Sequence, residues 1–227
     1  MSILFGFCNA GFKTTTRIFA DQKVEGHDHV PETGPAIFVS NHLSNLDPAI
    51  VASITKRSPN FLAKKELFKF PLFAWLLKWY GAHPLNRGTS DLKALRWAMT
   101  RLKEDNPGLI LFPEGTRNRD GSGMKRALPG VTHIALQSGV QIIPVGLTGT
   151  EPLQNVLKVF APRANIRINI GKPFRINNAG TGRPGREALE TMTNEIMVRI
   201  AHLLPDEYRG YYREMANTPF EYTEELA

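Results

Sequence analysis

A histidine and an aspartate five positions apart, His42 and Asp47, are residues whose types could do chemistry together. They lie in the stretch VSNHLSNLDPAI, residues 39–50. On one continuous helix this spacing turns the two side chains roughly 140° apart, so they could not meet. Pro48 offers a way out, because it disfavours a helical backbone at Asp47 and suits the first position of a helix. We therefore expect a strand at 36–40, a loop that folds the imidazole back onto the carboxylate, and Asp47 as the N-cap of the next helix.

An imidazole oriented by a carboxylate is typical of a general base, since a neutral histidine can accept a proton near physiological pH. Each residue alone has a plainer interpretation. A loop histidine often only bonds to the backbone, and an aspartate before a proline is more often only a helix cap. The other histidines show no metal-ligand spacing, so we expect no metal site.

A second candidate is the stretch FPEGTRNRDG, residues 112–121. It places Glu114, Gly115, Thr116 and Arg117 on one tight turn after an apolar run. Arginine is suited to bidentate capture of a phosphate group. The alternative is a solvated turn held by a local ion pair between Glu114 and Arg117, which adds little stability.

Segments that could position these residues alternate along the chain. Apolar, β-rich runs occur at 36–40, 60–64, 82–86, 109–114, 141–147 and 165–171, and helix-like segments at 48–57, 66–80, 89–105, 127–139 and 186–204. The alternation predicts a single α/β domain in which a central, mostly parallel or mixed sheet is flanked by helices. Pro144 favours an edge position or a bulge for the fifth strand.

Ligands of such sheets gather at the carboxyl ends of the strands. The candidate residues fall there. His42 follows the first predicted strand and Lys64 ends the second, while Arg87 follows the third and Glu114 ends the fourth. We therefore expect one site at this edge of the sheet.

The composition limits the possible partners. The 227 residues carry a formal net charge of +7 and a pI of about 9.6, which indicates nucleic acid, a phosphorylated metabolite, an acidic carrier protein or an anionic membrane as the partner.

The single cysteine, Cys8, excludes an intramolecular disulfide, and we expect its thiol to be buried. No run reaches the roughly 18 apolar residues of a spanning helix. The N-terminus shows no convincing cleavage site, so we expect it to be retained.

Three segments follow from these patterns. We expect an amphipathic, membrane-associating segment over residues 1–23, the folded domain over 24–212 and a tail over 213–227.

Residues 64–81, KKELFKFPLFAWLLKWYG, interleave aromatic and basic side chains. We expect most of these aromatic residues to fill the core, and the face from Trp75 to Tyr80 to meet a membrane interface.

Four blocks of this sequence, NHLSNLDP, GAHPLNRG, FPEGTRNRDG and IIPVGLTGT, resemble in order and spacing the motifs of the glycerolipid acyltransferases. They are most similar to those of the bacterial 1-acylglycerol-3-phosphate acyltransferases. The similarity spans roughly residues 24 to 175, and LLPDEYRGYY, residues 203–212, resembles the C-terminal part of the same family. Asn118 stands where the family often has serine, and the block around Arg87 reads PLNRG in place of the more usual Val-Asp-Arg.

The resemblance implies transfer of a fatty acyl group from a thioester, acyl-CoA or acyl carrier protein, to the sn-2 hydroxyl of 1-acylglycerol 3-phosphate, without a further cofactor. His42 is then the general base and Asp47 the group that orients it. Arg87 and Arg117 match the phosphate-binding positions, with Lys64 close behind. Glu114 is expected to position Arg117 or a substrate hydroxyl.

The turn of Gly115 and Thr116, or the loop of His42, is expected to supply backbone donors for the oxyanion. The resemblance also implies peripheral attachment to an anionic membrane, at the cytoplasmic face of the inner membrane.

Two alternatives stay open. An enzyme of this kind could acylate another acceptor, such as glycerol 3-phosphate or a different lysolipid. A basic, non-catalytic module that binds membrane or nucleic acid is the alternative from another class. We expect no nucleic-acid partner, because no RNA-binding signature with stacked aromatic residues is present, and a bare basic surface does not require the turn of His42 and Asp47.

Overall fold

The apolar run at 36–40 lies at the centre of the molecule, for which a computed structural model describes residues 3–57, 59–86, 91–119, 121–177 and 184–226. This run forms strand β2 (Ala36–Ser40), and all of its residues are buried. Its side chains alternate between the two faces of a sheet, so that Phe38 packs in one hydrophobic cluster and Ile37 in another. Burial on both faces is what an apolar strand inside an α/β protein requires.

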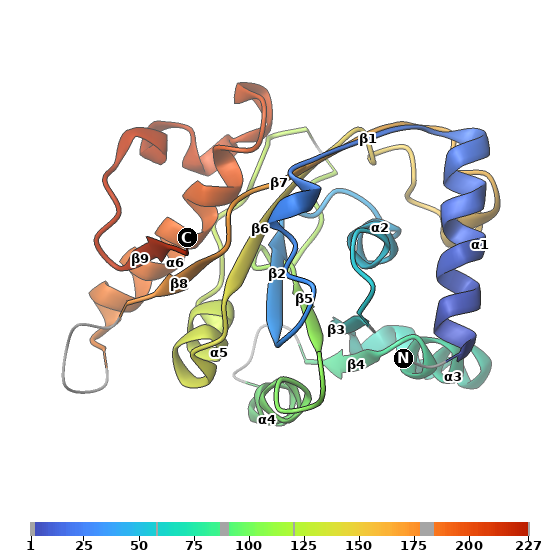
Figure 1. Cartoon of the computed structure of the whole chain (residues 1–227), viewed down its shortest axis with the longest axis horizontal. Helices are drawn as coiled ribbons and strands as arrows, with labels where there is room; N and C mark the ends of the chain where they lie inside the picture. The colour runs from blue at the N-terminus through green and yellow to red at the C-terminus, as the bar shows by residue number, and fades with distance from the viewer. Residues whose placement is uncertain (1–2, 58, 87–90, 120, 178–183, 227) are drawn as a thin grey trace.

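Among the described residues, nine strands form one mixed sheet (Figure 1). Its main order is β1 (Asp21–Glu25), β7 (Asn165–Ile170), β6 (Ile142–Thr148), β2, β5 (Gly108–Leu111), β3 (Pro59–Lys64) and β4 (Ala82–Leu85). Strands β6, β2, β5, β3 and β4 run parallel, whereas β7 is antiparallel to β6. Two short strands, β8 (Phe174–Ile176) and β9 (Thr223–Glu225), extend the sheet beside β6. The predicted fold class is confirmed.

Helices cover both faces of this sheet (Figure 1). The helices α1 (Ile3–Phe19), α2 (Asp47–Ser53) and α3 (Pro71–Trp79) pack in the cluster that contains Phe38. The helices α4 (Leu92–Arg101), α5 (Gly130–Ser138) and α6 (Arg186–Ala201) pack in the cluster that contains Ile37. The parallel strands therefore end together at one edge, between two helical layers.

Some boundaries differ from the predictions for identifiable reasons. The predicted helix at 66–80 is divided into a 3-10 helix, η2 (Lys65–Lys69), and α3, because Pro71 begins a new helix after an extended Phe70. The fourth predicted strand ends at Leu111 rather than at Glu114. The sequence does not predict strands β1, β8 and β9, since β8 has only three residues and β1 and β9 consist mostly of polar ones.

Of the two alternatives that Pro144 leaves open for the fifth strand, the edge position is wrong, and so is the expected burial of Cys8. Strand β6 lies inside the sheet rather than at its edge, although it contains Pro144. On the side away from β2, β6 pairs with β8 at Ile142 and with β7 only from Val145 onward, so the proline lies where the neighbouring strand changes. Cys8 is exposed rather than buried.

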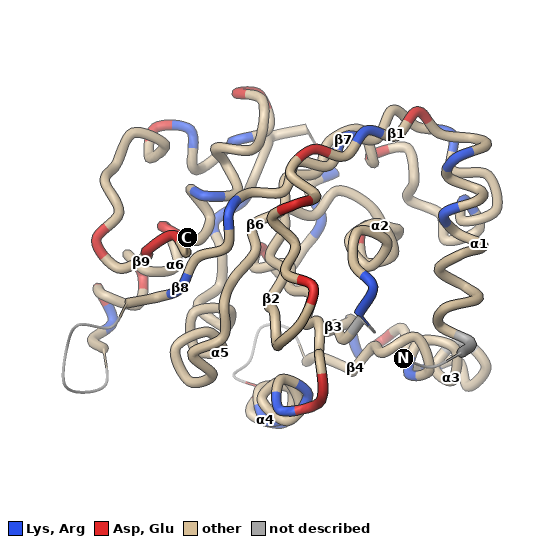
Figure 2. Tube along the Cα trace, viewed as in Figure 1, with Lys and Arg blue, Asp and Glu red and all other residues tan. Residues whose placement is uncertain are grey.

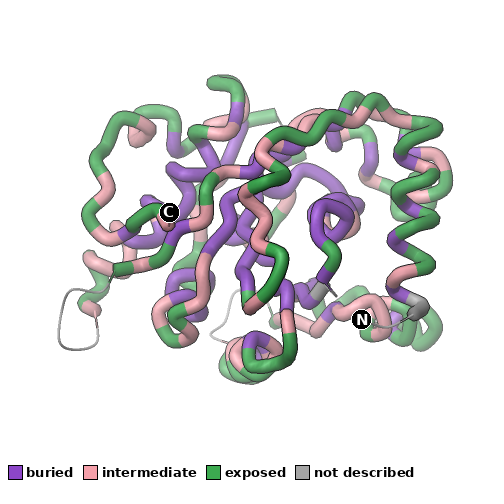
Figure 3. Tube along the Cα trace, in the orientation of Figure 1, coloured by how far each residue is buried: buried purple, intermediate pink, exposed green. Residues whose placement is uncertain are grey.

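The aromatic segment 64–81 also departs from its prediction. Phe70 is 71% exposed and does not fill the core, whereas Trp75, which the sequence places at the interface, is 58% exposed. Tyr80, which the sequence places at a membrane interface, packs on Phe5 with 5.5 Å between ring centroids. Figure 3 shows the contrast between the buried central strands and the exposed positions of α1. No helix in the described part of the chain is long and apolar enough to span a membrane.

Candidate active site

His42 and Asp47 meet at the carboxyl end of β2. Nδ1 of His42 lies 2.8 Å from Oδ2 of Asp47, and the two residues are 8% and 0% exposed. The loop between them folds back as the sequence predicts. The ring of His42 also stacks on Phe112, with 4.2 Å between centroids and 25° between planes. The imidazole is therefore fixed at Nδ1 and on one face, which leaves Nε2 as the nitrogen that can meet a substrate.

Asp47 does not cap the following helix, so that prediction is wrong. Helix α2 already includes Asp47, and no side-chain bond caps its first turn. The carboxylate instead turns back onto the preceding loop. Oδ2 accepts the backbone amides of Leu43 at 2.6 Å and Ser44 at 2.7 Å. Oδ1 accepts the hydroxyls of Ser44 and Thr150, each at 2.7 Å.

These bonds determine the ionisation of Asp47. Burial by itself raises the pKa of this carboxyl, because it removes the charged form from water. The hydrogen bond and charge of His42 and the bonds from Ser44 and Thr150 oppose burial and outweigh it, so the pKa of Asp47 lies below its ordinary value of 3.8. Asp47 is thus an ionised carboxylate that can hold the Nδ1–H tautomer of His42 and stabilise a positive imidazole.

Glu114 contacts the same loop from the segment that follows β5. Its Oε1 accepts the backbone amide of His42 at 3.0 Å, and its Oε2 accepts that of Lys125 at 2.8 Å. Burial raises the pKa of Glu114 to about 7, although these two hydrogen bonds act in the opposite direction. The sequence suggests that Glu114 positions Arg117 or a substrate hydroxyl. In the structure it holds the backbone of the catalytic candidate itself.

The turn after Glu114 brings Arg117 beside the same loop. Gly115 has a φ of 64°, a left-handed conformation that glycine adopts without strain. Nη1 of Arg117 donates to Oε1 of Gln154 at 3.1 Å, and Nε2 of Gln154 donates to the carbonyl of Leu43 at 2.6 Å. Arg117 is partly exposed, and Thr116 is exposed. The guanidinium is therefore held near His42 in a position that solvent reaches.

The remaining predicted residues lie along the same edge. Lys64 ends β3, and its Nζ lies 3.9 Å from Oε2 of Glu66. Strand β5 separates β3 from β2, which puts the ends of these two strands about 10 Å apart. Lys64 therefore shares the edge without joining the hydrogen-bonded cluster around His42. Arg87 follows β4 but lies outside the described residues.

Most of the backbone donors expected for an oxyanion are already engaged. The amides of residues 42–44 donate to the carboxylates of Glu114 and Asp47. The amide of Gly115 donates to the carbonyl of Phe112 at 3.0 Å. These groups shape the site instead of pointing at a reacting carbonyl.

Sequence reasoning missed four residues that fix the site: Ser44, Phe112, Thr150 and Gln154. Ser44 lies inside the His–Asp loop and Thr150 ends the block IIPVGLTGT, so their hydroxyls are visible in the sequence as polar groups near the right strands. Nothing in the sequence marks Phe112 as the ring under His42, or Gln154 as the bridge from Arg117 to Leu43.

Known proteins are similar to this chain in sequence. A sequence model of the acyltransferase family matches residues 21–148. The 1-acyl-sn-glycerol-3-phosphate acyltransferase of Streptococcus pneumoniae is 30% identical over 185 residues, which are 81% of this chain and 65% of that protein. The protein of the same name from Haemophilus influenzae is 33% identical over 142 residues, 62% of this chain and 55% of its own length.

A solved structure gives the same result. The 1-acyl-sn-glycerophosphate (LPA) acyltransferase PlsC from Thermotoga maritima matches with a TM-score of 0.64 and 25% identity, over 96% of this chain and 81% of that one. The chain spans less than two thirds of the length of either sequence relative above. The family model covers more than half of the chain and includes the His42–Asp47 loop and the Glu114 turn. This chain belongs to the acyltransferase family.

Proposed function

We propose that this chain is an O-acyltransferase that moves a fatty acyl group from a thioester to the sn-2 hydroxyl of 1-acylglycerol 3-phosphate, giving phosphatidate. The observation that carries the proposal is the 2.8 Å contact between Nδ1 of His42 and the buried carboxylate of Asp47. The names of the relatives support the choice of a lysophosphatidate acceptor. The acyl donor is acyl-CoA or an acyl carrier protein, and the step needs no further cofactor.

In the proposed reaction, Nε2 of His42 removes the proton of the acceptor hydroxyl as its oxygen attacks the thioester carbonyl. Asp47 stabilises the imidazolium that forms. The tetrahedral intermediate then collapses, the carbon–sulfur bond breaks, and the thiolate takes the proton back from His42. The new ester and the free thiol leave, so no acyl-enzyme forms.

The phosphate of the acceptor calls for cations at the same edge. Arg117 is held beside the His42 loop and suits a phosphate oxygen geometrically. Lys64 ends β3, about 10 Å along the edge from the end of β2. We assign these two residues to the phosphate, together with Arg87 by its motif position. Gly115 and Thr116 form the turn that presents Arg117.

Substitution of His42 tests the proposal. We expect His42→Ala to lower acyl transfer by about 10²-fold or more, because it removes the base. Its melting temperature should change little, and Lys103→Ala, on an exposed part of the chain, is the matched control. Transfer within a few-fold of wild type would refute the assignment. If the chain were a binding module, neither wild type nor His42→Ala would transfer an acyl group, and both would bind vesicles with the same affinity.

A transfer assay with a panel of substrates identifies the acyl donor and the acceptor. Labelled acyl-CoA and acyl carrier protein are each offered with lysophosphatidate, glycerol 3-phosphate and neutral lysolipids. We expect lysophosphatidate to be used best. Preference for glycerol 3-phosphate or for a neutral lysolipid would support the alternative acceptors instead.

We further propose that the chain attaches peripherally to an anionic membrane, at the cytoplasmic face of the inner membrane. Phe7 of α1 and Leu72 of α3 are 76% and 73% exposed, and Trp75 of α3 is also exposed. Ile18 lies on the same face of α1 as Phe7, because eleven residues make just over three helical turns. Apolar groups of this kind enter a membrane interface, and the excess of Lys and Arg attracts anionic headgroups. Sedimentation with anionic vesicles should weaken at high salt.

A further inference from the structure

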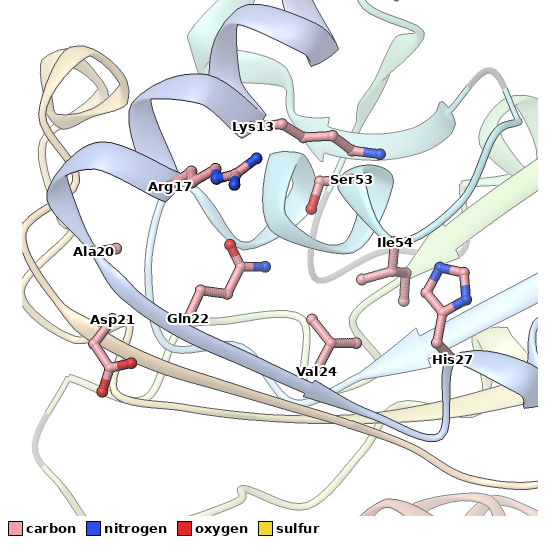
Figure 4. Close-up of a pocket in the computed structure, with 9 residues that line it drawn as sticks. All are labelled: Lys13, Arg17, Ala20, Asp21, Gln22, Val24, His27, Ser53 and Ile54. Carbon is pink, nitrogen blue, oxygen red and sulfur yellow. The ribbon is translucent and has the colours of Figure 1, made fainter.

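A second set of basic residues lies away from the active site, around a cavity of about 430 Å³. The cavity is bounded by α1, β1 and the last residues of α2 (Figure 4). Lys13 and Arg17 of α1 line it, together with Gln22 of β1 and His27. Its size lies within the range of small-ligand pockets, roughly 300–1,000 Å³.

The cavity is distinct from the site of His42. It adjoins Ser53 and Ile54 at the end of α2, whereas Asp47 lies at the beginning of that helix. Six residues of helix separate Asp47 from Ser53 by about 9 Å. None of the described candidate active-site residues lines the cavity. A ligand there would leave the proposed acyl transfer chemistry untouched.

The charge around this cavity is not balanced. Neither Lys13 nor Arg17 has a carboxylate partner within 4 Å in the part of the chain that the structure describes. Asp21, the one acidic residue among the described lining residues, is already paired with Arg167 at 2.7 Å. Figure 2 shows the basic positions of α1 on the half of the helix that adjoins β1. Two cations that face one cavity favour an anion between them.

The neutral lining groups suit the same ligand. In Figure 4 the side chains of Gln22 and His27 lie around the cavity with Lys13 and Arg17. Gln22 and His27 have no side-chain hydrogen bond to another described residue. An amide, a ring N–H, an ammonium and a guanidinium are all hydrogen-bond donors, and donors of this kind around one cavity suit the oxygens of a phosphate group.

The surroundings of the cavity indicate where such a phosphate comes from. Ile18 and Phe19 follow Arg17 directly and are exposed, as is Phe7 on the same helix. Phe7 and Ile18 share one face of α1 and Arg17 lies on the adjoining face, so a lipid whose chains contact the apolar face has its headgroup beside Arg17. We propose that the cavity binds the phosphate of an anionic lipid headgroup, separately from the acceptor in the active site. This inference rests on the peripheral membrane attachment proposed above.

The test compares two double variants that remove the same charge. Lys13→Gln with Arg17→Gln changes the cavity, and Arg96→Gln with Lys103→Gln changes two exposed positions outside it, on and just after α4. Both are compared with wild type in sedimentation with phosphatidylcholine vesicles and with vesicles that also contain phosphatidylglycerol. We expect the cavity variant to bind the anionic vesicles at least about tenfold more weakly than the control variant. Equal losses in both variants would overturn the proposal, because they indicate diffuse attraction.

A second arm uses inorganic phosphate, with the side-chain amide resonance of Gln22 and the ring resonances of His27 as the readout. We expect saturable shifts in wild type and in the control variant and none in the cavity variant. Absence of shifts in wild type with both phosphate and anionic vesicles overturns the site. If inorganic phosphate causes saturable resonance shifts but both vesicle types bind equally well, the ligand of the cavity is not the phosphate of a lipid headgroup, and that part of the proposal is overturned.

Acyl transfer to a short-chain, water-soluble lysophosphatidate separates this inference from the proposed function. The cavity variant should retain wild-type turnover in that assay, whereas His42→Ala should not. If wild type binds no vesicle at all, membrane attachment fails, and with it the lipid source. Loss of soluble turnover in the cavity variant, with an unchanged melting temperature, would show that the cavity belongs to the active site.

Discussion

Replacing Asp47 by asparagine removes the charge beside His42 and keeps the shape of the side chain. Oδ2 of Asp47 accepts Nδ1 of His42 and the backbone amides of Leu43 and Ser44. Because those two amides are fixed donors, the carbonyl oxygen of the substituted side chain must occupy the position of Oδ2. Its NH₂ group then faces the hydroxyls of Ser44 and Thr150, which can rotate and accept. The hydrogen-bond geometry and the Nδ1–H tautomer should therefore survive Asp47→Asn.

In the proposed reaction, the substitution removes stabilisation of the imidazolium in the transition state. A hydrogen bond to a charged group contributes about 1.5–3 kcal/mol, which corresponds to a fall in kcat of about 10- to 150-fold. A change of tautomer would cost far more, about 10⁴-fold. The structure predicts the smaller loss, because the backbone amides hold the orientation of the new side chain.

The measurement is release of the free thiol from the thioester donor, followed with lysophosphatidate as acceptor, together with the melting temperature. Thr150→Val is the matched control, because it removes one hydrogen bond to the same carboxylate and leaves the charge in place. We expect it to lower kcat only a few-fold. Activity of Asp47→Asn within a few-fold of wild type would refute the role of the charge, and a loss near 10⁴-fold would refute the argument about the tautomer.

The acid limb of stability gives an independent check on Asp47. Its pKa in the folded state lies below the ordinary value of 3.8. The stability that its ionised form contributes is therefore present above pH 3.8 and is lost as the pH falls through the lowered pKa. Asp47→Asn should remove this dependence, which melting curves below about pH 5 can measure. An unchanged acid limb would contradict the assignment.

Three further predictions concern the turn at residues 114–117. The pKa of Glu114 is raised from 4.5 to about 7, so its neutral form is favoured in the folded state. The free energy of unfolding should therefore fall by roughly 3 kcal/mol as the pH rises from 4.5 through 7. Glu114→Gln should abolish this pH dependence, which melting curves at about pH 5 and pH 8 measure. Arg117→Ala should raise KM for lysophosphatidate by about 10-fold or more but leave a phosphate-free lysolipid nearly unaffected, and equal effects on both acceptors would remove the phosphate role. Gly115→Ala should destabilise the fold by about 1 kcal/mol, since φ is 64° and a new Cβ would lie 3.0 Å from Cδ1 of Leu128; an unchanged denaturant midpoint would contradict this.

The sequence alone determined the layout of the site. Apolar runs of strand length, separated by helical segments, predict a mostly parallel or mixed sheet, and the strand at 36–40 has the predicted bounds. The His42–Asp47 spacing with Pro48 predicts a loop that folds back, and the 2.8 Å contact is observed. These features depend on a few neighbouring residues, whose backbone preferences and periodicity are local.

Only the tertiary structure decided which distant groups complete the site. Thr150 is 103 positions from Asp47, and Glu114 is 72 positions from His42, yet each is hydrogen bonded to it. The sequence assigns Asp47 to a helix cap and Glu114 to its neighbour Arg117 because it offers only local partners. A buried carboxylate is instead stable only when hydrogen-bond donors surround it, from whichever part of the chain they come. Which donors those are depends on how the strands are ordered in the sheet, and that order is set by the packing of the whole chain.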